Sequence, residues 1–307
     1  MLINKFSRSD LRAFFANRIA FYERKLPEYA EDLLYYLDMS FERIFVTLGL
    51  IEKYHHVKKG KILEIGSFPF FFTLPLLEMS DDAVTGIVAP EQIWPGEPYE
   101  IAKTSTSIET TNKSYPFDYW TCNVEKDIFP FNDETFDMVI CTEVLEHLIQ
   151  DPGHMMYEIN RVLKPGGFLI LTTPNALFWK VIHKLIFFGN HEHYSKYGVY
   201  GRHNRLWAPD EIDYILTGNN FQTIELRCAF AQEKKLDFMS ANKLTLQSIV
   251  YDFSLFLMAV LVNFPIHFLR KKKGDQLYIV AKKTGGPKTY YARRLYSQSK
   301  FSYDVKL

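Results

Sequence analysis

The sequence predicts an α/β fold built on a mostly parallel sheet, and residues 136–175 carry this prediction. Residues 136–141 (FDMVIC) and 167–173 (GFLILTT) are short apolar runs rich in β-branched residues, which is typical of buried strands. Between them, residues 155–163 have apolar side chains at helical spacing, and a Lys-Pro-Gly-Gly run beginning at Lys164 ends that helix. Two buried strands joined by a helix pair in parallel, and the chemistry of such sheets collects at the carboxyl ends of the strands.

Composition limits the classes of function. The chain has 307 residues, of which 47% are hydrophobic, so it can build one large domain or a domain with additions. Its 36 basic and 36 acidic residues balance, so no nucleic-acid partner is expected. The three cysteines, Cys122, Cys141 and Cys228, lack metal-site spacing and favour buried thiols in a cytoplasmic protein. The charged N-terminal stretch does not resemble a signal peptide.

Further strands are predicted from short apolar runs on both sides of this stretch. They are residues 61–66, 83–88, 119–125, 221–228 and 276–282. Residues 89–118 are polar and contain proline, which predicts a long connection without a strand. Residues 208–218 predict a helix with Pro209 near its start.

Several blocks of the sequence match, in order and spacing, those of a known family. Phe136-Asp137 opens a strand, residues 143–148 (EVLEHL) follow it, and residues 161–167 (RVLKPGG) end the next helix. Over roughly residues 60–283 the chain resembles class I methyltransferases that use S-adenosylmethionine, including bacterial O-methyltransferases of glycans and small molecules. The resemblance implies a doubly wound, Rossmann-like sheet of seven strands with helical insertions, in which the last two strands form an antiparallel hairpin.

The resemblance also implies a division of the chain. Residues 1–58 form an N-terminal helical cap, which either shapes the substrate pocket or only covers a sheet edge. Residues 59–285 form the methyltransferase core, with insertions at about 176–207 and 233–274, and residues 286–307 form a C-terminal tail. The first insertion either lines the acceptor site or is a solvated loop.

The expected cofactor site departs from the family in its first loop. The family pattern is acidic-x-Gly-x-Gly-x-Gly, of which Glu64 and Gly66 match, whereas Phe68 and Phe70 replace the other glycines. Phenylalanine lacks the conformational freedom of glycine, so a different loop shape is expected. Val88 stands where the family has an acidic residue for the ribose. The residues expected to bind S-adenosylmethionine are Glu64, Gly66, Ser67, Asn123, Val124 and Thr142.

A second group of residues carries the expected catalysis. Glu143, Glu146 and His147 stand at i, i+3 and i+4, so a helix beginning at Thr142 would present all three on one face. The same Glu-x-x-Glu-His pattern in small-RNA 2′-O-methyltransferases and quinone-pathway O-methyltransferases resembles a metal site, to which His203 would add a further ligand.

The resemblance implies that Glu143, Glu146, His147 and His203 are catalytic and hold Mg²⁺ or Mn²⁺ beside the acceptor hydroxyl. The alternative is that the two carboxylates are solvated or ion-paired and His147 acts alone as a general base.

Together these features predict methyl transfer to a hydroxyl of a sugar, glycan or related small molecule, as in glycan biosynthesis. The alternative is a non-catalytic protein of the same fold that has lost cofactor binding and serves in binding or assembly. Phe68, Phe70 and Val88 favour that alternative, whereas the group around His147 favours an enzyme.

Residues 248–273 raise the question of a membrane. Residues 253–262 are apolar apart from Ser254, and 270–273 read Arg-Lys-Lys-Lys. Polar residues interrupt any window of the ~20 apolar residues that a spanning helix needs, so no transmembrane span is expected. A helix lying on a membrane surface and a helix packed on the core both fit. The chain is therefore expected in the cytoplasm, either free or peripheral to the inner face of the membrane, and its oligomeric state is not indicated.

Overall fold

A computed structural model describes residues 7–25, 27–90, 99–110, 113–150, 152–188, 203–229, 254, 257 and 274–288. Its helices are α1 (Arg8–Lys25), α2 (Pro27–Tyr54), α3 (Thr73–Met79), α4 (Pro152–Val162), α5 (Trp179–Phe188) and α6 (Pro209–Gly218), with a 3-10 turn, η2, at Leu145–His147. Its strands are β1 (Lys61–Ile65), β2 (Ala83–Val88), β3 (Ala102–Glu109), β4 (Ser114–Thr121), β5 (Phe136–Thr142), β6 (Leu163–Pro174), β7 (Phe221–Ala229) and β8 (Gln276–Lys283).

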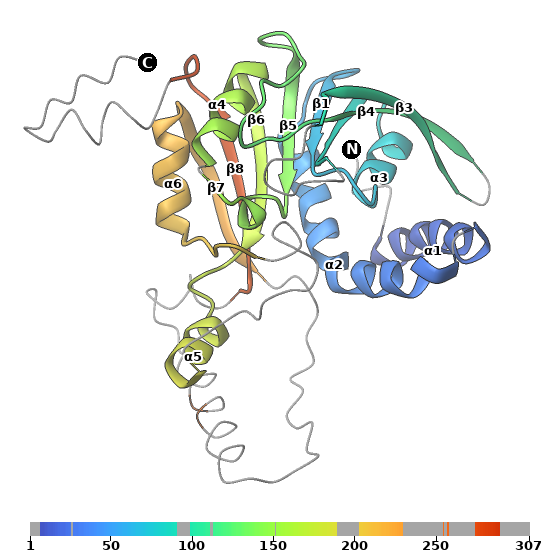
Figure 1. Ribbon diagram of the computed structural model, residues 1–307, viewed down its shortest axis with the longest axis horizontal. Helices are drawn as coiled ribbons and strands as arrows, with labels where there is room; N and C mark the ends of the chain where they lie inside the picture. The colour runs from blue at the N-terminus through green and yellow to red at the C-terminus, as the bar shows by residue number, and fades with distance from the viewer. Residues whose placement is uncertain are drawn as a thin grey trace, which may run out of the picture.

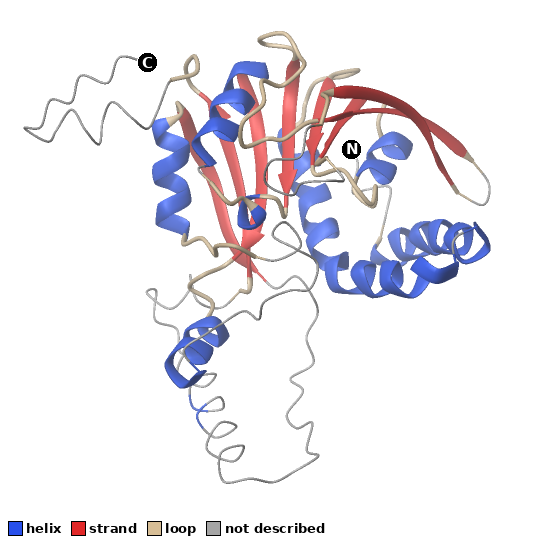
Figure 2. Cartoon of the chain, in the orientation of Figure 1, coloured by secondary structure: helices blue, strands red, loops and turns tan. Residues whose placement is uncertain are grey.

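The strands form one sheet in the order β3-β4-β2-β1-β5-β6-β8-β7 (Figures 1 and 2). Strands β4, β2, β1, β5 and β6 run parallel. Strand β8 is antiparallel to both β6 and β7, which confirms the expected terminal hairpin. The predicted α/β fold with a doubly wound, mostly parallel sheet is therefore confirmed.

The strand count is larger than expected, because the connection predicted over residues 89–118 contains a strand. Strand β3 pairs in an antiparallel register with β4, from Ala102 opposite Thr121 to Glu109 opposite Ser114. Its sequence, AKTSTSIE, is mostly Ser and Thr, and all but Ile108 keep some exposure. An edge strand needs little apolar surface, so the apolar pattern that identifies buried strands is absent from it.

Side-chain alternation builds one core on each face of the sheet. On β1, Ile62 points into a core shared with the N-terminal helices, whereas Leu63 and Ile65 point into a core on the opposite face. Helices α1, α2 and α3 contribute to the first core, and α4 and α6 to the second. The sheet is thereby covered on both faces, which leaves the carboxyl ends of its parallel strands as the open edge.

The N-terminal region, expected to be a helical cap, contains α1 and α2 packed on one face of the sheet (Figure 1). The membrane interpretation of residues 248–273 concerns a stretch of which only Ser254 and Leu257 are described. Over the described part of the chain, no helix has the length and apolar character needed to span a bilayer.

Candidate active site

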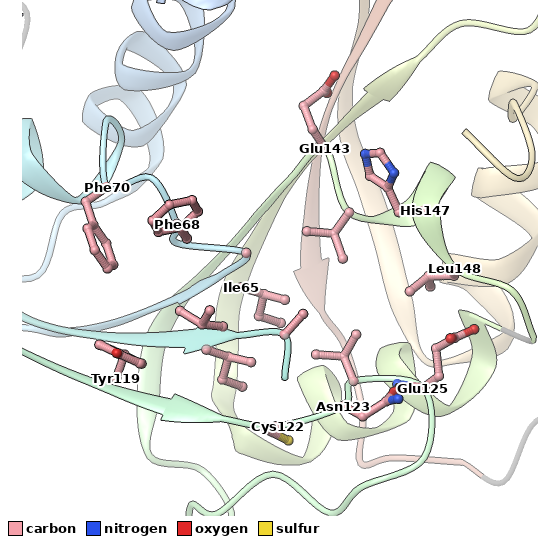
Figure 3. A pocket seen from close by; sticks show the side chains of 16 residues that line it. Ile65, Phe68, Phe70, Tyr119, Cys122, Asn123, Glu125, Glu143, His147 and Leu148 are labelled. Atoms are coloured by element: carbon pink, nitrogen blue, oxygen red, sulfur yellow. Dashed lines mark hydrogen bonds between the residues drawn. The ribbon is translucent and has the colours of Figure 1, made fainter. Parts of the chain in front are cut away.

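A cavity of about 490 Å³ opens at the carboxyl ends of the parallel strands. Figure 3 shows its walls coming from the loops after β1, β2, β4 and β5. Most of the side chains that line it are apolar, and the polar exceptions cluster at two ends, one near Asn123 and one near His147. Its lining residues are Ile65, Gly66, Phe68, Phe70, Ile87, Val88, Ala89, Tyr119, Cys122, Asn123, Val124, Glu125, Glu143, Val144, His147 and Leu148.

The loop after β1 needs glycine at its first position. Gly66 has φ of 76°, and a Cβ added there would lie 2.5 Å from Cγ2 of Val144, so both the backbone and the space exclude a side chain. Phe70, at the position of the family's third glycine, also has a positive φ, of 69°. The backbone of Phe70 therefore adopts the left-handed conformation that glycine favours, and the different loop shape expected from Phe68 and Phe70 stays a prediction.

Aromatic rings hold this loop in place. The Phe70 ring lies 5.6 Å from that of Phe117 and 6.0 Å from that of Tyr119, both on β4. Phe68 contacts Phe70 edge-on at 5.7 Å and is itself 65% exposed at the cavity. The loop that lacks two glycines thus supplies an aromatic wall to the cavity (Figure 3).

The exit of β4 forms a tight turn around Asn123. The backbone N–H of Asn123 donates to Asp127 Oδ2 at 2.8 Å, and its side-chain Oδ1 accepts from the N–H of Glu125 at 2.9 Å. Glu125 Oε1 in turn accepts from the backbone N–H groups of Ile149 and Gln150, at 2.7 and 2.6 Å. These bonds join two loops across the cavity and fix the polar end at which an adenine edge could be bound.

The six residues expected to bind the cofactor separate into two sets. Gly66, Asn123 and Val124 line the large cavity. Glu64, Ser67 and Thr142 border a neighbouring polar cavity of about 60 Å³, together with Gly66. Glu64 is buried and accepts a 2.5 Å hydrogen bond from Thr73 Oγ1, and burial raises its pKa to about 8. The Glu64 carboxyl group thus joins β1 to Thr73, at the start of α3, and supports the loop between them.

The helix expected to begin at Thr142 is absent, and this corrects the prediction that Glu143, Glu146 and His147 share one helix face. Only Leu145–His147 form a 3-10 turn, and Glu143 has φ of 53°. The Glu143 carboxylate accepts bonds from Thr172 Oγ1 at 2.9 Å and from the Gln276 side chain.

Glu143 also forms an ion pair with Arg43 of α2, at 2.8 Å and with both side chains largely buried. Burial opposes the charge of Arg43, but Glu143 raises the pKa of the guanidinium above its ordinary value. Arg43 was not predicted as a site residue, because a charged residue within an amphipathic helix is usually solvated. Its position between Phe41 and Ile44, both buried, is the signal that could have identified it.

The other three residues do come together. Glu146, His147 and His203 each offer one ligand atom, and these atoms all lie within 4.8 Å of one another. The rings of His147 and His203 are 5.1 Å apart, and Asn204 Nδ2 donates to the backbone carbonyl of His147 at 2.7 Å. The end of the first insertion is thus held against η2.

Glu146 is completely buried at the base of this group. Its Oε2 accepts from Thr173 Oγ1 at 3.0 Å, and its Oε1 has no hydrogen-bond partner within the described ranges. Burial, and then the neighbouring Glu143, raise the pKa of Glu146 well above its ordinary range. This buried oxygen lies 3.9 Å from Nε2 of His147, which suits either a shared proton or a bound cation.

Comparison with known proteins identifies the fold to which this site belongs. A model of the methyltransferase domain matches residues 96–171, which include Asn123, Thr142 and the Glu143–His147 segment. A tRNA U34 carboxymethyltransferase of Nautilia profundicola is 27% identical over 150 residues, 49% of this chain and 45% of that protein. A ubiquinone biosynthesis O-methyltransferase of Vibrio atlanticus is 33% identical over 96 residues, 31% of this chain and 38% of that protein.

The match thus spans less than half the length of either of these two relatives. Neither name concerns a sugar, so these relatives give the expected sugar or glycan acceptor no support.

Solved structures are similar to this chain at lower sequence identity. A S-adenosylmethionine-dependent methyltransferase from Archaeoglobus fulgidus has a TM-score of 0.48 and 15% identity, covering 79% of this chain and 94% of that chain. One from Methanosarcina mazei has a TM-score of 0.45 and 18% identity, covering 76% and 96%. Residues 96–171 are thus similar to a methyltransferase domain, and they lie within the doubly wound, mostly parallel sheet described above.

Proposed function

We propose that this chain transfers a methyl group from S-adenosylmethionine to an oxygen of a small, hydroxyl-bearing acceptor. One observation carries the proposal: a single cavity joins the strand ends at Gly66 and Asn123, expected to hold the cofactor, to Glu143 and His147. Its volume, about 490 Å³, lies within the range of small-molecule sites. When bound, the cofactor would supply a methyl group on a sulfonium, which an acceptor oxygen can attack with S-adenosylhomocysteine as the leaving group.

The chain's own residues divide the work of binding. Asn123 and the turn that it fixes offer hydrogen-bonding groups to an adenine edge. Gly66 lines the cavity, and its left-handed backbone allows the first loop to turn there with Val144 packed against it. The apolar wall between these points holds the two reactants in a fixed orientation. It also excludes water, which protects the sulfonium from hydrolysis.

His147 is placed to take the proton of the acceptor hydroxyl. It lines the cavity, and its Nε2 lies 3.9 Å from Glu146 Oε1. In the neutral form it accepts a proton as the acceptor oxygen attacks. Such a base contributes about 10²–10⁴-fold to the rate.

A divalent ion is compatible with the same group. Glu146, His147 and His203 supply one carboxylate oxygen and two imidazole nitrogens, and Glu146 Oε1 is buried without a hydrogen-bond partner in the described structure. Glu143 does not join them, because it binds Arg43 and Gln276. This nitrogen-rich set suits Mn²⁺ better than Mg²⁺. An ion there would lower the pKa of an acceptor hydroxyl.

A small acceptor fits the charge of the chain better than a nucleic acid. Formal net charge is zero, so the long-range attraction to phosphates that nucleic-acid binding uses is absent. The relatives' names concern tRNA and ubiquinone biosynthesis, and the sugar acceptor expected from the sequence is a third class. A catechol, a sugar diol and a tRNA are therefore the compounds to compare.

A second candidate function is non-catalytic binding by the same fold. Val88 at the end of β2 offers no carboxylate for the ribose, and Phe68 places a ring in the cavity wall where the family has a glycine. Calorimetric titration with S-adenosylmethionine and S-adenosylhomocysteine separates the two candidates. Binding of either compound supports the enzyme. If neither compound binds, the non-catalytic alternative is supported.

The catalytic roles are tested by methyl transfer with the best acceptor. His147→Ala should reduce turnover about 10²–10⁴-fold while cofactor binding persists, whereas the exposed His56→Ala is a matched control. If a metal acts there, EDTA abolishes turnover, Mn²⁺ restores it, and Glu146→Gln prevents the restoration. Full turnover after exhaustive chelation would exclude the metal and leave His147 as the base.

A further inference from the structure

The ring of Phe68 is exposed at the cavity that holds the candidate active site. Phe68 lines this cavity and is 65% exposed, and of the phenylalanines whose side chains the structure describes it alone is exposed. It stands at the second glycine of the family pattern, so the ring occupies a part of the wall where the family has no side chain. An exposed apolar side chain in a concave site indicates a surface that a ligand covers.

The first loop holds this ring in a fixed place. Phe70 meets it edge-on, with the two ring centres 5.7 Å apart and the ring planes at 82°. Phe70 is itself packed against Phe117 and Tyr119 of β4. The ring of Phe68 is thus supported by a packed ring, while its exposure leaves a face open to the cavity. A side chain that is held in place before binding loses little conformational entropy when a ligand binds.

Phe68 lies toward the reacting end of the cavity. It borders both the large cavity and the neighbouring polar cavity, as Gly66 and Glu143 do. Figure 3 shows Phe68 and Glu143 well separated from Asn123, where an adenine edge could be bound. With adenine at Asn123, the sulfonium lies toward the opposite end, because its methyl group has to reach an acceptor beside His147.

The charges of the wall leave this end without a free anion. The Glu143 carboxylate is balanced by Arg43, at 2.8 Å. Glu125, the other carboxylate among the lining residues, lies beside Asn123 (Figure 3). The part of the described wall near Phe68 therefore offers a cation an aromatic face and no unpaired carboxylate. The face of a phenylalanine ring is negative and attracts a cation within about 6 Å of its centre.

We propose that the face of Phe68 binds the sulfonium of S-adenosylmethionine through a cation–π interaction, which makes Phe68 a specificity-determining residue. The inference rests on the proposed function, because it requires the cofactor in this cavity. The attraction depends on the positive charge, so it is absent for S-adenosylhomocysteine, which is a neutral thioether. Phe68 therefore raises the affinity for the cofactor relative to that for the product of methyl transfer.

Calorimetric titration of the full chain with three ligands tests this role. They are S-adenosylmethionine, S-adenosylhomocysteine and sinefungin, which carries a protonated amine in place of the methyl sulfonium. Phe68→Leu keeps an apolar side chain and removes the ring. We expect it to weaken binding of the two cationic ligands about fivefold to thirtyfold, and binding of the neutral one much less. Phe68→Tyr keeps the ring and should keep the wild-type ratio of affinities.

Tyr214→Leu is the matched control, because Tyr214 is 67% exposed on α6 and is not among the lining residues. It should leave all three affinities unchanged. Circular dichroism shows whether each variant is folded, and Phe68→Met repeats the test if leucine disturbs the loop. Equal changes for all three ligands in the variants without a ring, or no change, would overturn the proposal and leave the proposed function standing. If the wild-type chain binds none of the three ligands, both fail.

Discussion

The two loops that border the cavity reach their conformations by opposite routes. In the loop after β1, Phe70 replaces a glycine of the family pattern, yet its φ of 69° is in the region that glycine favours. In the loop after β5, residues 143–147 keep the family pattern, yet they do not form the expected α-helix. The difference teaches that a residue pattern and a backbone conformation can change independently, because contacts from distant elements select the conformation.

Those contacts differ in kind between the loops. Phe70 is held by the rings of Phe117 and Tyr119, which pack against its side chain. Glu143 is held by Arg43 and Gln276, which come from a helix and a strand about a hundred residues or more away in the chain. One loop therefore depends on apolar packing and the other on buried charge, and the two should respond to different perturbations.

The largest effect is expected where the two loops touch, at Gly66. Valine there would place Cβ 2.5 Å from the Val144 side chain and would force a β-branched residue into a left-handed backbone. The steric overlap and the strained backbone together cost about 2–5 kcal/mol. We expect Gly66→Val to abolish binding of S-adenosylmethionine in calorimetric titration.

Gly286→Val is the matched control, because a Cβ at Gly286 meets no atom within 4 Å. Circular dichroism of both variants reports whether the sheet is intact. Wild-type affinity in Gly66→Val would mean that the cofactor pocket has been assigned to the wrong loops.

The next largest effect is expected at Arg43, and it tests the contribution of buried charge to the stability of the second loop. Arg43→Met leaves the buried Glu143 without its cation, and losing one partner of a buried ion pair costs about 3–5 kcal/mol. We expect urea unfolding to show a loss of this size. Lys103→Met is the control, because its pair with Asp118 is about half exposed and should contribute far less. Equal losses in the two variants would show that Arg43 does not hold the second loop.

The same contrast explains how much of the molecule could be predicted from sequence. Apolar runs predicted β1, β2, β5 and β6 because each is buried on both faces, which is the condition that such runs record. Strand β3 was missed because an edge strand of Ser and Thr has no such run. At the site, the grouping of Glu146, His147 and His203 was predicted, and an ion-paired Glu143 was one of the alternatives, but the partner of Glu143 was not predicted. Its partner Arg43 lies on α2, 100 residues earlier in the chain, so the spacing of residues 143–147 cannot predict the contact.

A smaller effect is expected from pH, through Glu64 beneath the first loop. Burial raises its pKa from 4.5 to about 8, so between these values the folded chain keeps a proton that the unfolded chain releases. The free energy of unfolding should therefore fall as pH rises from about 4.5 to about 8, by on the order of a few kcal/mol, and level off above that.

Glu64→Gln should remove this contribution while keeping an oxygen acceptor for Thr73. In urea unfolding, the variant should therefore gain stability relative to wild type between pH 5 and pH 8.5. Glu100→Gln, at an exposed residue, is the control and should keep the wild-type slope. Glu146 contributes its own pH dependence equally in all three proteins. Parallel curves for the Glu64 variant and wild type would show that Glu64 is ionised in the folded chain.

The smallest effect tests the first loop itself, by comparing glycine and alanine at Phe70. Both substitutions remove the ring and its contacts with Phe117 and Tyr119, so this loss cancels in the comparison. What remains is the backbone: alanine at φ of 69° carries a left-handed penalty of about 1–2 kcal/mol, whereas glycine does not. Glycine costs about 0.5–1 kcal/mol in backbone entropy relative to alanine, so the net difference should favour Phe70→Gly by up to about 1.5 kcal/mol.

Phe68 provides the reversed control two residues earlier. Its φ is not positive, so Phe68→Ala should be more stable than Phe68→Gly, the usual order. Urea unfolding of the four variants measures both differences. Opposite signs at Phe68 and Phe70 would show that the loop after β1 keeps a glycine conformation without the glycine. The same sign at both would show that the loop relaxes once the ring is removed, and that aromatic packing alone imposes the left-handed backbone.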